Sequence, residues 1–202
     1  MVFDLDGVLL RGNAVRVFLA GRLRRAPARA LPLALAAPLV ALGAAAGPTR
    51  PAAARLLTVV AGANADTSAD YREALARHPE AAVADALACL RAHRAAGDRV
   101  VVATAAEETL ARGYLDALGL ADVEVVGSTG WPRPVRVHGG AKVRALVARG
   151  FPPPWAAVYS DSASDLPLFA GTPRPVLVNA PAGAVAQVTR TLGAAPGTRT
   201  WH

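Results

Sequence analysis

The sequence predicts an α/β fold in which a parallel β-sheet has helices on both faces and a small α-helical domain is inserted after the first strand. Strand and helix patterns alternate along residues 79–202, which is typical of βαβ units. The β-branched run at 100–102 is uninterrupted, as in strands that are buried on both faces. Residues 12–78 have a helical pattern and are too long for one crossover. We therefore assign residues 1–11 and 79–202 to the sheet domain and residues 12–78 to the insert.

Two elements frame the insert. Val2–Leu5 is predicted to be a short buried strand, which Asp6-Gly7 cuts off. Within the insert, alanine-rich helical patterns are interrupted by proline and glycine, and only residues 56–61 resemble a strand. Pro79 is expected to open a helix, because its missing N–H costs nothing at the first helical position. That helix would end at Gly97 and carry an apolar stripe of Val83, Leu87 and Leu90.

The second half of the chain continues the alternation. We expect strands at 100–104, 123–126, 156–160 and 176–178, and helices at 107–118, 140–148 and 166–170. These elements predict a Rossmann-like sheet. The last segment, Gly193–His202, is rich in Gly, Pro and Thr and is expected to be loose.

Composition excludes several classes of protein. Apolar residues make up 53% and charged residues 18% of the 202 residues, so the signature of intrinsic disorder is absent. A lone cysteine, Cys89, cannot form an internal disulfide, which excludes a disulfide-stapled secreted scaffold and favours a reducing compartment. The first residues show no export signal. We therefore expect a cytoplasmic protein.

The net charge of +7 leaves open an attraction to phosphorylated molecules or to anions at a membrane surface. Arginine supplies 21 of the 22 basic residues, and Lys142 is the single lysine. The arginines are spread along the chain and aromatic residues make up only 5%, so no nucleic-acid partner is expected. Arg11, Arg16 and Arg22 lie early in the insert, where they could meet an anionic substrate.

The segment Ala30–Thr49 raises the question of a membrane, because it contains no charged residue and follows several arginines. Its length would just cross a bilayer, which takes about 20 apolar residues. However, it contains Pro32, Pro38 and Pro48 and consists largely of alanine. We favour helices buried in a soluble protein, with peripheral membrane contact as the alternative.

Polar side chains recur where the predicted strands end. Asp4 and Asp6 follow the first strand, Thr104 ends the second, and Asp161 and Asp165 follow the strand at 156–160. Ligands of open parallel sheets bind beyond these carboxyl ends. Carboxylates that converge there would repel one another unless a cation offsets their charge, and hard oxygen ligands favour Mg²⁺.

Four segments, in this order, resemble the motifs of the haloacid dehalogenase superfamily of aspartate-nucleophile phosphatases. They are Phe3–Val8, Val101–Thr104, the Gly140-Ala141-Lys142 segment and Tyr159–Leu168. The order of the motifs and their positions on strands make the resemblance specific. The insert is similar to the helical cap of the phosphoserine-phosphatase-like branch. One departure is Ser160, which stands where the family commonly has glycine.

The resemblance implies a role for each motif residue. Asp4 would attack phosphorus and form an aspartyl-phosphate, and Asp6 would act as general acid and then as general base. Thr104 would bind the phosphoryl oxygens, and Lys142 would neutralise charge on the nucleophile and on the phosphate. Mg²⁺ would be held by Asp4, the backbone carbonyl of Asp6 and Asp161, with Asp165 at the metal or just behind it.

Simpler interpretations exist for the same residues. An Asp-Gly pair after a strand is often only a turn. Thr104 could cap the helix that begins near Glu107, and Asp165 could be the N-cap of the helix at 166–170. His78, His93 and His138 lack metal-ligand spacing and are expected in surface or loop positions. Cys89 is expected to be a small buried hydrophobic residue.

The sequence thus predicts a Mg²⁺-dependent phosphatase that acts on a small phosphorylated substrate. One alternative is a membrane-associated phosphatase of lipid phosphates, similar to a phosphatidylglycerophosphatase, which would use residues 30–49 to reach its substrate. Others are a phosphate-binding module without catalysis and a nucleic-acid binder driven by the positive charge.

Overall fold

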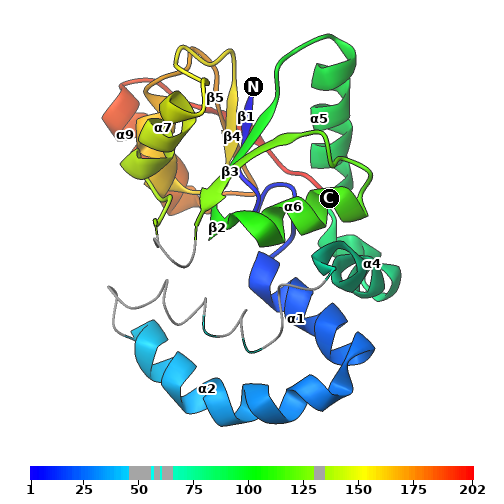
Figure 1. Ribbon diagram of the computed structural model, residues 1–202. Coiled ribbons are helices and arrows are strands. Elements are labelled where there is room, and N and C mark those ends of the chain that lie inside the picture. Colours follow the sequence, from blue (N-terminus) through cyan, green and yellow to red (C-terminus); the bar gives the residue numbers. More distant parts are fainter. Residues whose placement is uncertain (46–55, 57–59, 61–65, 130–134) are drawn as a thin grey trace.

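The computed structural model describes residues 1–45, 56, 60, 66–129 and 135–202, and its centre is a six-stranded parallel sheet (Figure 1). The strands are β1 (Val2–Phe3), β2 (Val101–Glu107), β3 (Glu124–Ser128), β4 (Val158–Ser160), β5 (Pro175–Val178) and β6 (Gly197–Arg199). Their spatial order is β3-β2-β1-β4-β5-β6, and every neighbouring pair is parallel. The predicted Rossmann-like α/β fold is confirmed.

The described helices lie on both faces of this sheet and beyond its carboxyl edge. They are α1 (Ala14–Arg25), α2 (Ala30–Ala45), α4 (Thr67–Arg77), α5 (Ala84–Ala95), α6 (Glu108–Ala117), α7 (Gly140–Ala148), α8 (Leu166–Phe169) and α9 (Ala182–Leu192). Helices α5 and α6 lie on one side of the sheet, and α7 and α9 lie on the other (Figure 1). Helices α1, α2 and α4 lie beyond the strands' carboxyl ends, within the residues that we assigned to the cap.

Alternation along the strands explains the two apolar layers. Val2 belongs to the cluster with α7, α8 and α9, whereas Phe3 belongs to the cluster with α5 and α6. Val101 and Val102 divide in the same way. Successive side chains of a strand point to opposite faces, so a strand covered on both sides must be apolar at every position.

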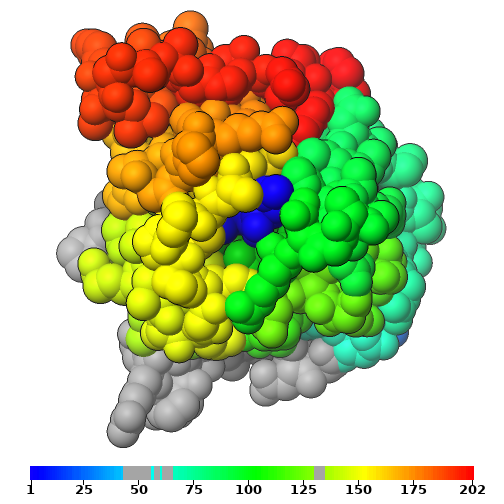
Figure 2. All heavy atoms as spheres, turned by 90° about the horizontal axis from the view of Figure 1, so that it is seen from above, coloured from blue at the N-terminus to red at the C-terminus, as the bar shows by residue number. Residues whose placement is uncertain are grey.

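Strand β1 lies at the middle of the sheet although it is only two residues long. Figure 2 views the sheet from the amino ends of its strands and shows the N-terminal atoms at the floor of a hollow. The amino group of Met1 donates to the carbonyl oxygen of Arg99 at 2.7 Å, and Val101 N donates to the carbonyl of Met1. These bonds extend the pairing of β1 with β2 by one residue.

The C-terminal tail differs from our expectation. Residues 197–199 form β6, which pairs with β5. The Asn179 side chain holds the next turn, since its Oδ1 accepts from Trp201 N at 2.9 Å and its Nδ2 donates to the Trp201 carbonyl at 3.0 Å. The Trp201 ring also stacks on Tyr159, with 5.5 Å between the centroids. The prediction of a loose tail was wrong. A parallel edge strand of three residues is too short to show a periodic pattern in the sequence, and no hairpin turn precedes it to indicate a strand.

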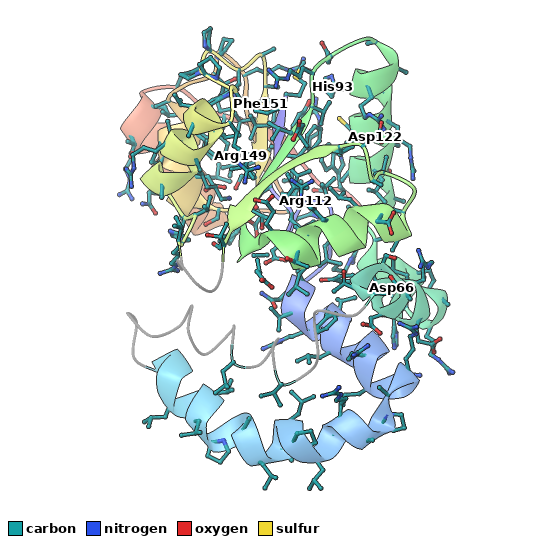
Figure 3. All side chains as sticks on the ribbon, viewed as in Figure 1. Asp66, His93, Arg112, Asp122, Arg149 and Phe151 are labelled. Atoms are coloured by element: carbon teal, nitrogen blue, oxygen red, sulfur yellow. The ribbon has the colours of Figure 1, made fainter. Side chains whose placement is uncertain are left out.

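His93 also departs from prediction. It lies on α5, between that helix and the sheet (Figure 3). Its Nδ1 is 2.8 Å from Asp98 Oδ2, and its Nε2 is 2.9 Å from the Tyr159 hydroxyl. This histidine therefore links α5 to β4 and is not a surface or loop residue. Cys89 is only partly buried, against the same apolar layer.

Other elements also differ from the prediction. Pro79 opens a short 3₁₀ turn, Pro79–Ala81, and the α-helix begins only at Ala84. Strand β2 continues past Thr104 to Glu107, with a register shift after Ala103. Helix α9 was not predicted. Of the predicted strand at 56–61, the two described residues, 56 and 60, are helical, and the others lie outside the described residues.

Helix α2 lies within the uncharged segment 30–49, whose last residues fall outside the described part of the chain. We expected its helices to be buried, yet four of its leucines face solvent. Among the described residues, no helix is long and apolar enough to cross a membrane.

Helices α1 and α4 pack closely because a glycine lies between them. A Cβ at Gly21 would come within 1.8 Å of the backbone oxygen of Asp70. Tyr71 of α4 also packs edge-on against Tyr114 of α6, with ring centroids 5.5 Å apart. The inserted helices therefore share one apolar cluster with the sheet domain, which fixes how they approach the carboxyl edge.

We expect Gly21→Ala to lower the free energy of unfolding by about 3 kcal/mol, because the added methyl group forces α1 away from α4. Urea unfolding followed by circular dichroism measures this change. The matched control is Gly183→Ala in α9, where a Cβ meets no atom within 4 Å. It should raise stability by about 0.5 kcal/mol. Equal effects of the two substitutions would contradict the close α1–α4 contact.

Candidate active site

The candidate site lies where the strand order reverses. Strands β2 and β3 extend to one side of β1, and β4, β5 and β6 extend to the other. The crevice beyond the carboxyl ends of strands at such a switch point is where open α/β sheets bind ligands. Phe3 is in register with Val102 of β2 and Tyr159 of β4, so Asp4 follows at the centre of this edge.

The turn after β1 orients the two aspartates of the first motif. Asp4 N still donates to the Tyr159 carbonyl at 2.9 Å, so the backbone of Asp4 remains part of the sheet. The chain then bends back, and the carbonyl of Leu5 accepts from the N–H groups of both Leu9 and Leu10. Gly7 has φ +79°, a conformation that favours glycine. This bend turns Asp6 towards the first residues of α1.

Lys142 joins two carboxylates in the buried centre of the site. Its Nζ lies 2.9 Å from Asp4 Oδ2 and 2.8 Å from Asp165 Oδ2, and its side chain is 3% exposed. Helix α7 positions the lysine, with Gly139 at its N-cap and Lys142 N bonded to the Gly139 carbonyl. The only lysine of the chain thus lies between motifs that are far apart in the sequence.

Asp165 is held by more than Lys142. Its Oδ2 also accepts from the Ser160 hydroxyl at 2.8 Å, and Ser160 in turn accepts from Ser162 N at 3.2 Å. Asp165 stands at the N-cap position of α8, but its side chain makes no capping bond there. Its second oxygen, Oδ1, is buried and has no hydrogen-bond partner among the described residues. The carboxylate therefore faces the site and does not cap the helix.

Asp161 closes the site next to the Asp6-Gly7 turn. A Cβ at Gly7 would lie 2.1 Å from Asp161 Oδ2, so only glycine leaves room for this carboxylate. The two loops that follow β1 and β4 meet at this point. Gly7 and Asp161 also line a pocket of about 320 Å³, together with Arg11, Asn179 and the last three residues of the chain.

Asp6 is bound by the start of the inserted helices. Its Oδ1 accepts from Ala14 N at 2.8 Å, and its Oδ2 lies 3.4 Å from Asn13 Nδ2. Asn13 is the N-cap of α1, and its own side-chain oxygen accepts from Val15 N. Negative charge is favoured at a helix N-terminus, which suits a carboxylate in this position.

Thr104 is buried beside these residues, at 1% exposure. The regular pairing of β2 with β3 ends at Ala103, one residue earlier. The Thr104 hydroxyl oxygen accepts from Ala106 N at 3.0 Å. Thr104 does not cap the following helix, because the N-cap position of α6 is Glu107, whose side chain makes no capping bond.

Burial raises the pKa of three carboxyl groups. It raises the pKa of Asp4 to about 7, against the opposing effect of Lys142, and Asp165 adds to the rise. It raises the pKa of Asp6 to about 6, with the Ala14 N–H opposing the change. The pKa of Asp161 is also raised by burial. Burial alone would lower the pKa of Lys142, but Asp4 and Asp165 outweigh it, so that this pKa is raised.

The oxygen donors at this site suit a magnesium ion that the protein coordinates only in part, and not a metal that protein ligands surround completely. Within the described residues, no three His, Cys, Asp or Glu side chains converge on one metal position. Mg²⁺ is typically held by one or two carboxylates, with waters and substrate phosphate completing an octahedron. Asp165 Oδ1 has no hydrogen-bond partner among the described residues, so it is an oxygen atom that a cation at the site could engage. Such a cation would also offset the charge of the neighbouring carboxylates.

Sequence reasoning missed two positioning residues. Ser160 was noted only as a departure from the family pattern, yet its hydroxyl orients Asp165. Asn13 was not singled out, although it lies against Asp6 and begins α1. An asparagine just before a helical pattern is a typical N-cap signal, which could have identified it. Of the arginines expected near an anionic substrate, Arg11 lines the pocket, whereas Arg22 pairs with Asp70.

We expect the metal-free protein to lose stability as the pH rises from about 4 to 7. The folded state binds more protons than the unfolded state in this range, since the pKa values of Asp4 and Asp6 are about 7 and 6 and the ordinary value is 3.8. The loss should be about 6 kcal/mol, since each pKa unit corresponds to about 1.4 kcal/mol, and urea unfolding in chelator across this pH range measures it. The double variant Asp4→Asn/Asp6→Asn should show a flatter profile, and a wild-type profile that rises with pH would contradict the assignment.

Comparison with known proteins identifies a family and agrees with the fold. The sequence model of haloacid dehalogenase-like hydrolases matches residues 1–170. No curated protein matches the chain.

Solved structures with low sequence identity share the fold. A protein of unknown function from Bordetella pertussis Tohama I has a TM-score of 0.69 and 22% identity, over 97% of this chain and 96% of that one. A predicted phosphatase from Clostridium acetobutylicum has a TM-score of 0.59 and 15% identity, over 98% and 92%. A phosphoserine phosphohydrolase-like protein from Francisella tularensis has a TM-score of 0.51 and 12% identity, over 98% and 93%.

Proposed function

The chain belongs to the haloacid dehalogenase-like hydrolases, and from that premise we propose that it is a Mg²⁺-dependent phosphatase that hydrolyses a small phosphomonoester through an aspartyl-phosphate on Asp4. The observation that carries the proposal is the buried contact of Lys142 with Asp4 and Asp165 at the carboxyl edge of the sheet. A cytoplasmic location is part of the proposal, supported by the lone cysteine.

In the first step, a carboxylate oxygen of Asp4 attacks phosphorus, and the bond from phosphorus to the leaving oxygen breaks. The bonds from Leu5 N at 2.8 Å and from Lys142 at 2.9 Å hold the carboxylate in one orientation. Such positioning lowers the entropic part of the barrier. The Lys142 ammonium also opposes the rise that burial causes in the pKa of Asp4.

Asp6 supplies the proton that the leaving oxygen needs. A pKa of about 6 leaves a useful fraction of this carboxyl protonated near neutral pH, while the ionised form remains accessible. After proton transfer, the Asp6 carboxylate accepts a proton from the water that attacks the aspartyl-phosphate. The second attack releases inorganic phosphate, restores the Asp4 carboxylate and returns the proton to Asp6.

Thr104 and Lys142 are proposed to bind the oxygens of the transferred phosphoryl group. The Thr104 oxygen accepts from Ala106 N, which leaves its O–H free to donate to a phosphate. A bound Mg²⁺, held by Asp4, Asp161 and the Asp6 carbonyl with Asp165 behind it, would supply positive charge that stabilises the phosphate oxygens.

The direct test is hydrolysis of p-nitrophenyl phosphate by wild-type protein and by Asp4→Asn, with Mg²⁺ and with chelator. We expect Asp4→Asn to lose at least about 10³-fold in rate, because no other group can take its place as nucleophile. The matched control is Asp122→Asn at an exposed carboxylate outside the site, which should retain full activity. Full activity of Asp4→Asn, or of wild-type protein in chelator, would contradict the mechanism. Phosphate binding without turnover would favour a non-catalytic module.

Lys142→Met should reduce the rate by about 10²–10³-fold, because it removes the charge that faces the transferring group. It also leaves the Asp4 and Asp165 carboxylates buried without their cation, so its loss of stability should be larger at pH 8 than at pH 5. Arg144→Met, at an exposed position of the same helix, should change neither property. A Lys142→Met enzyme with wild-type rate would exclude the proposed role of the lysine.

A further inference from the structure

Helix α2 presents a stripe of exposed leucines. Leu31, Leu35, Leu39 and Leu42 are 68%, 73%, 63% and 72% exposed. Their spacing places them on one face of the helix, since residues three and four apart are neighbours on its surface. Soluble proteins rarely leave such a contiguous apolar face in contact with water.

The opposite face of α2 is apolar as well. Leu33 and Ala36 are buried there, at 9% exposure each, and Leu33 belongs to the main apolar cluster. The helix therefore has an inner face that packs against the protein and an exposed outer face that lacks polar side chains. In Figure 1, α2 lies farthest from the sheet, and Figure 3 shows side chains along its outer edge that point away from the molecule.

The charge of the chain is concentrated around this helix. Residues 7–65 contain eight arginines and no aspartate or glutamate, whereas the rest of the chain has 14 basic and 15 acidic residues. The inserted segment as a whole, residues 12–78, has nine arginines against three acidic residues, so it carries +6 of the net charge of +7. Arg24 and Arg29 are exposed, and Arg29 lies two residues before Leu31 at the start of the stripe.

We propose that the outer face of α2, with Leu31, Leu35, Leu39, Leu42, Arg24 and Arg29, docks on the surface of a bilayer that contains anionic lipid. The leucines enter the boundary between headgroups and acyl chains, and the arginines pair with lipid phosphates. The helix lies in the plane of the interface and does not cross the bilayer, in agreement with the absence of a spanning helix among the described residues.

Charge and apolar surface together favour this partner over two others. A nucleic acid would use the arginines but would leave the leucine stripe in water, since α2 carries no charge and no aromatic ring on which bases could stack. A second copy of the chain would bring two equally basic segments together, which costs energy. An anionic bilayer is the partner that satisfies both features at once.

The test is co-sedimentation with vesicles of 30% phosphatidylglycerol in phosphatidylcholine, compared with pure phosphatidylcholine, at 0.1 M salt. Wild-type protein should sediment with the anionic vesicles and remain largely in solution with the neutral ones. Leu35→Glu/Leu39→Glu should lose binding to background. Arg24→Gln/Arg29→Gln should weaken binding to anionic vesicles by about tenfold or more. These experiments use the intact chain and no substrate, so their outcome is independent of the proposed phosphatase activity.

The matched control is Val147→Glu/Ala186→Glu, which adds the same charge at exposed positions of α7 and α9. It should bind as wild type does. Circular dichroism and thermal unfolding verify that both glutamate variants remain folded. The proposal is overturned if wild-type protein ignores anionic vesicles, if the control loses binding equally, or if Leu35→Glu/Leu39→Glu instead converts a dimer to a monomer. The proposal would also be overturned if RNA displaced the protein from vesicles while the leucine substitutions had no effect on vesicle binding.

Discussion

The structure around the site depends on one buried ammonium group that lies between two carboxylates. Lys142 contacts Asp4 at 2.9 Å and Asp165 at 2.8 Å, and it comes from a helix on one face of the sheet while both partners follow strands. Without this charge, burial of the two carboxylates at the carboxyl edge would cost several kcal/mol. The contact therefore ties α7 to the loops after β1 and β4, and it orients the aspartate that we propose as nucleophile.

The sheet could be predicted because its central strands contain runs of consecutive apolar residues and alternate with helical patterns along the chain. Val100–Val102 and Val2-Phe3 carry that pattern plainly. The tail could not be predicted, because β6 is three exposed residues whose position depends on bonds between Asn179 and Trp201. Tertiary contacts of this kind have no periodic signature in the sequence. His93 was misjudged for the same reason, since its partners, Asp98 and Tyr159, come from other elements.

The site residues were found through motif order and strand placement, and their mutual arrangement required the structure. Sequence alone does not show that Asp165 turns away from its helix towards Lys142, or that Ser160 fixes it there. It does not show that Asp6 binds the first turn of α1 through Ala14 N. The bond from Ala14 N to Asp6 links the proposed acid to the inserted helices. The inserted segment therefore both positions Asp6 and carries the exposed leucines of α2.

The most direct measurement of the central claim is to identify the carboxylate that becomes phosphorylated. Enzyme mixed with p-nitrophenyl phosphate and Mg²⁺, quenched in acid within the first turnovers and digested with a protease, should carry phosphate on the peptide that contains Asp4. Asp6→Asn should accumulate more of this species, because nitrophenolate leaves without needing a proton from Asp6 whereas the attack of water is slowed. Phosphate on a different residue, or turnover with no covalent species in either protein, would contradict the account.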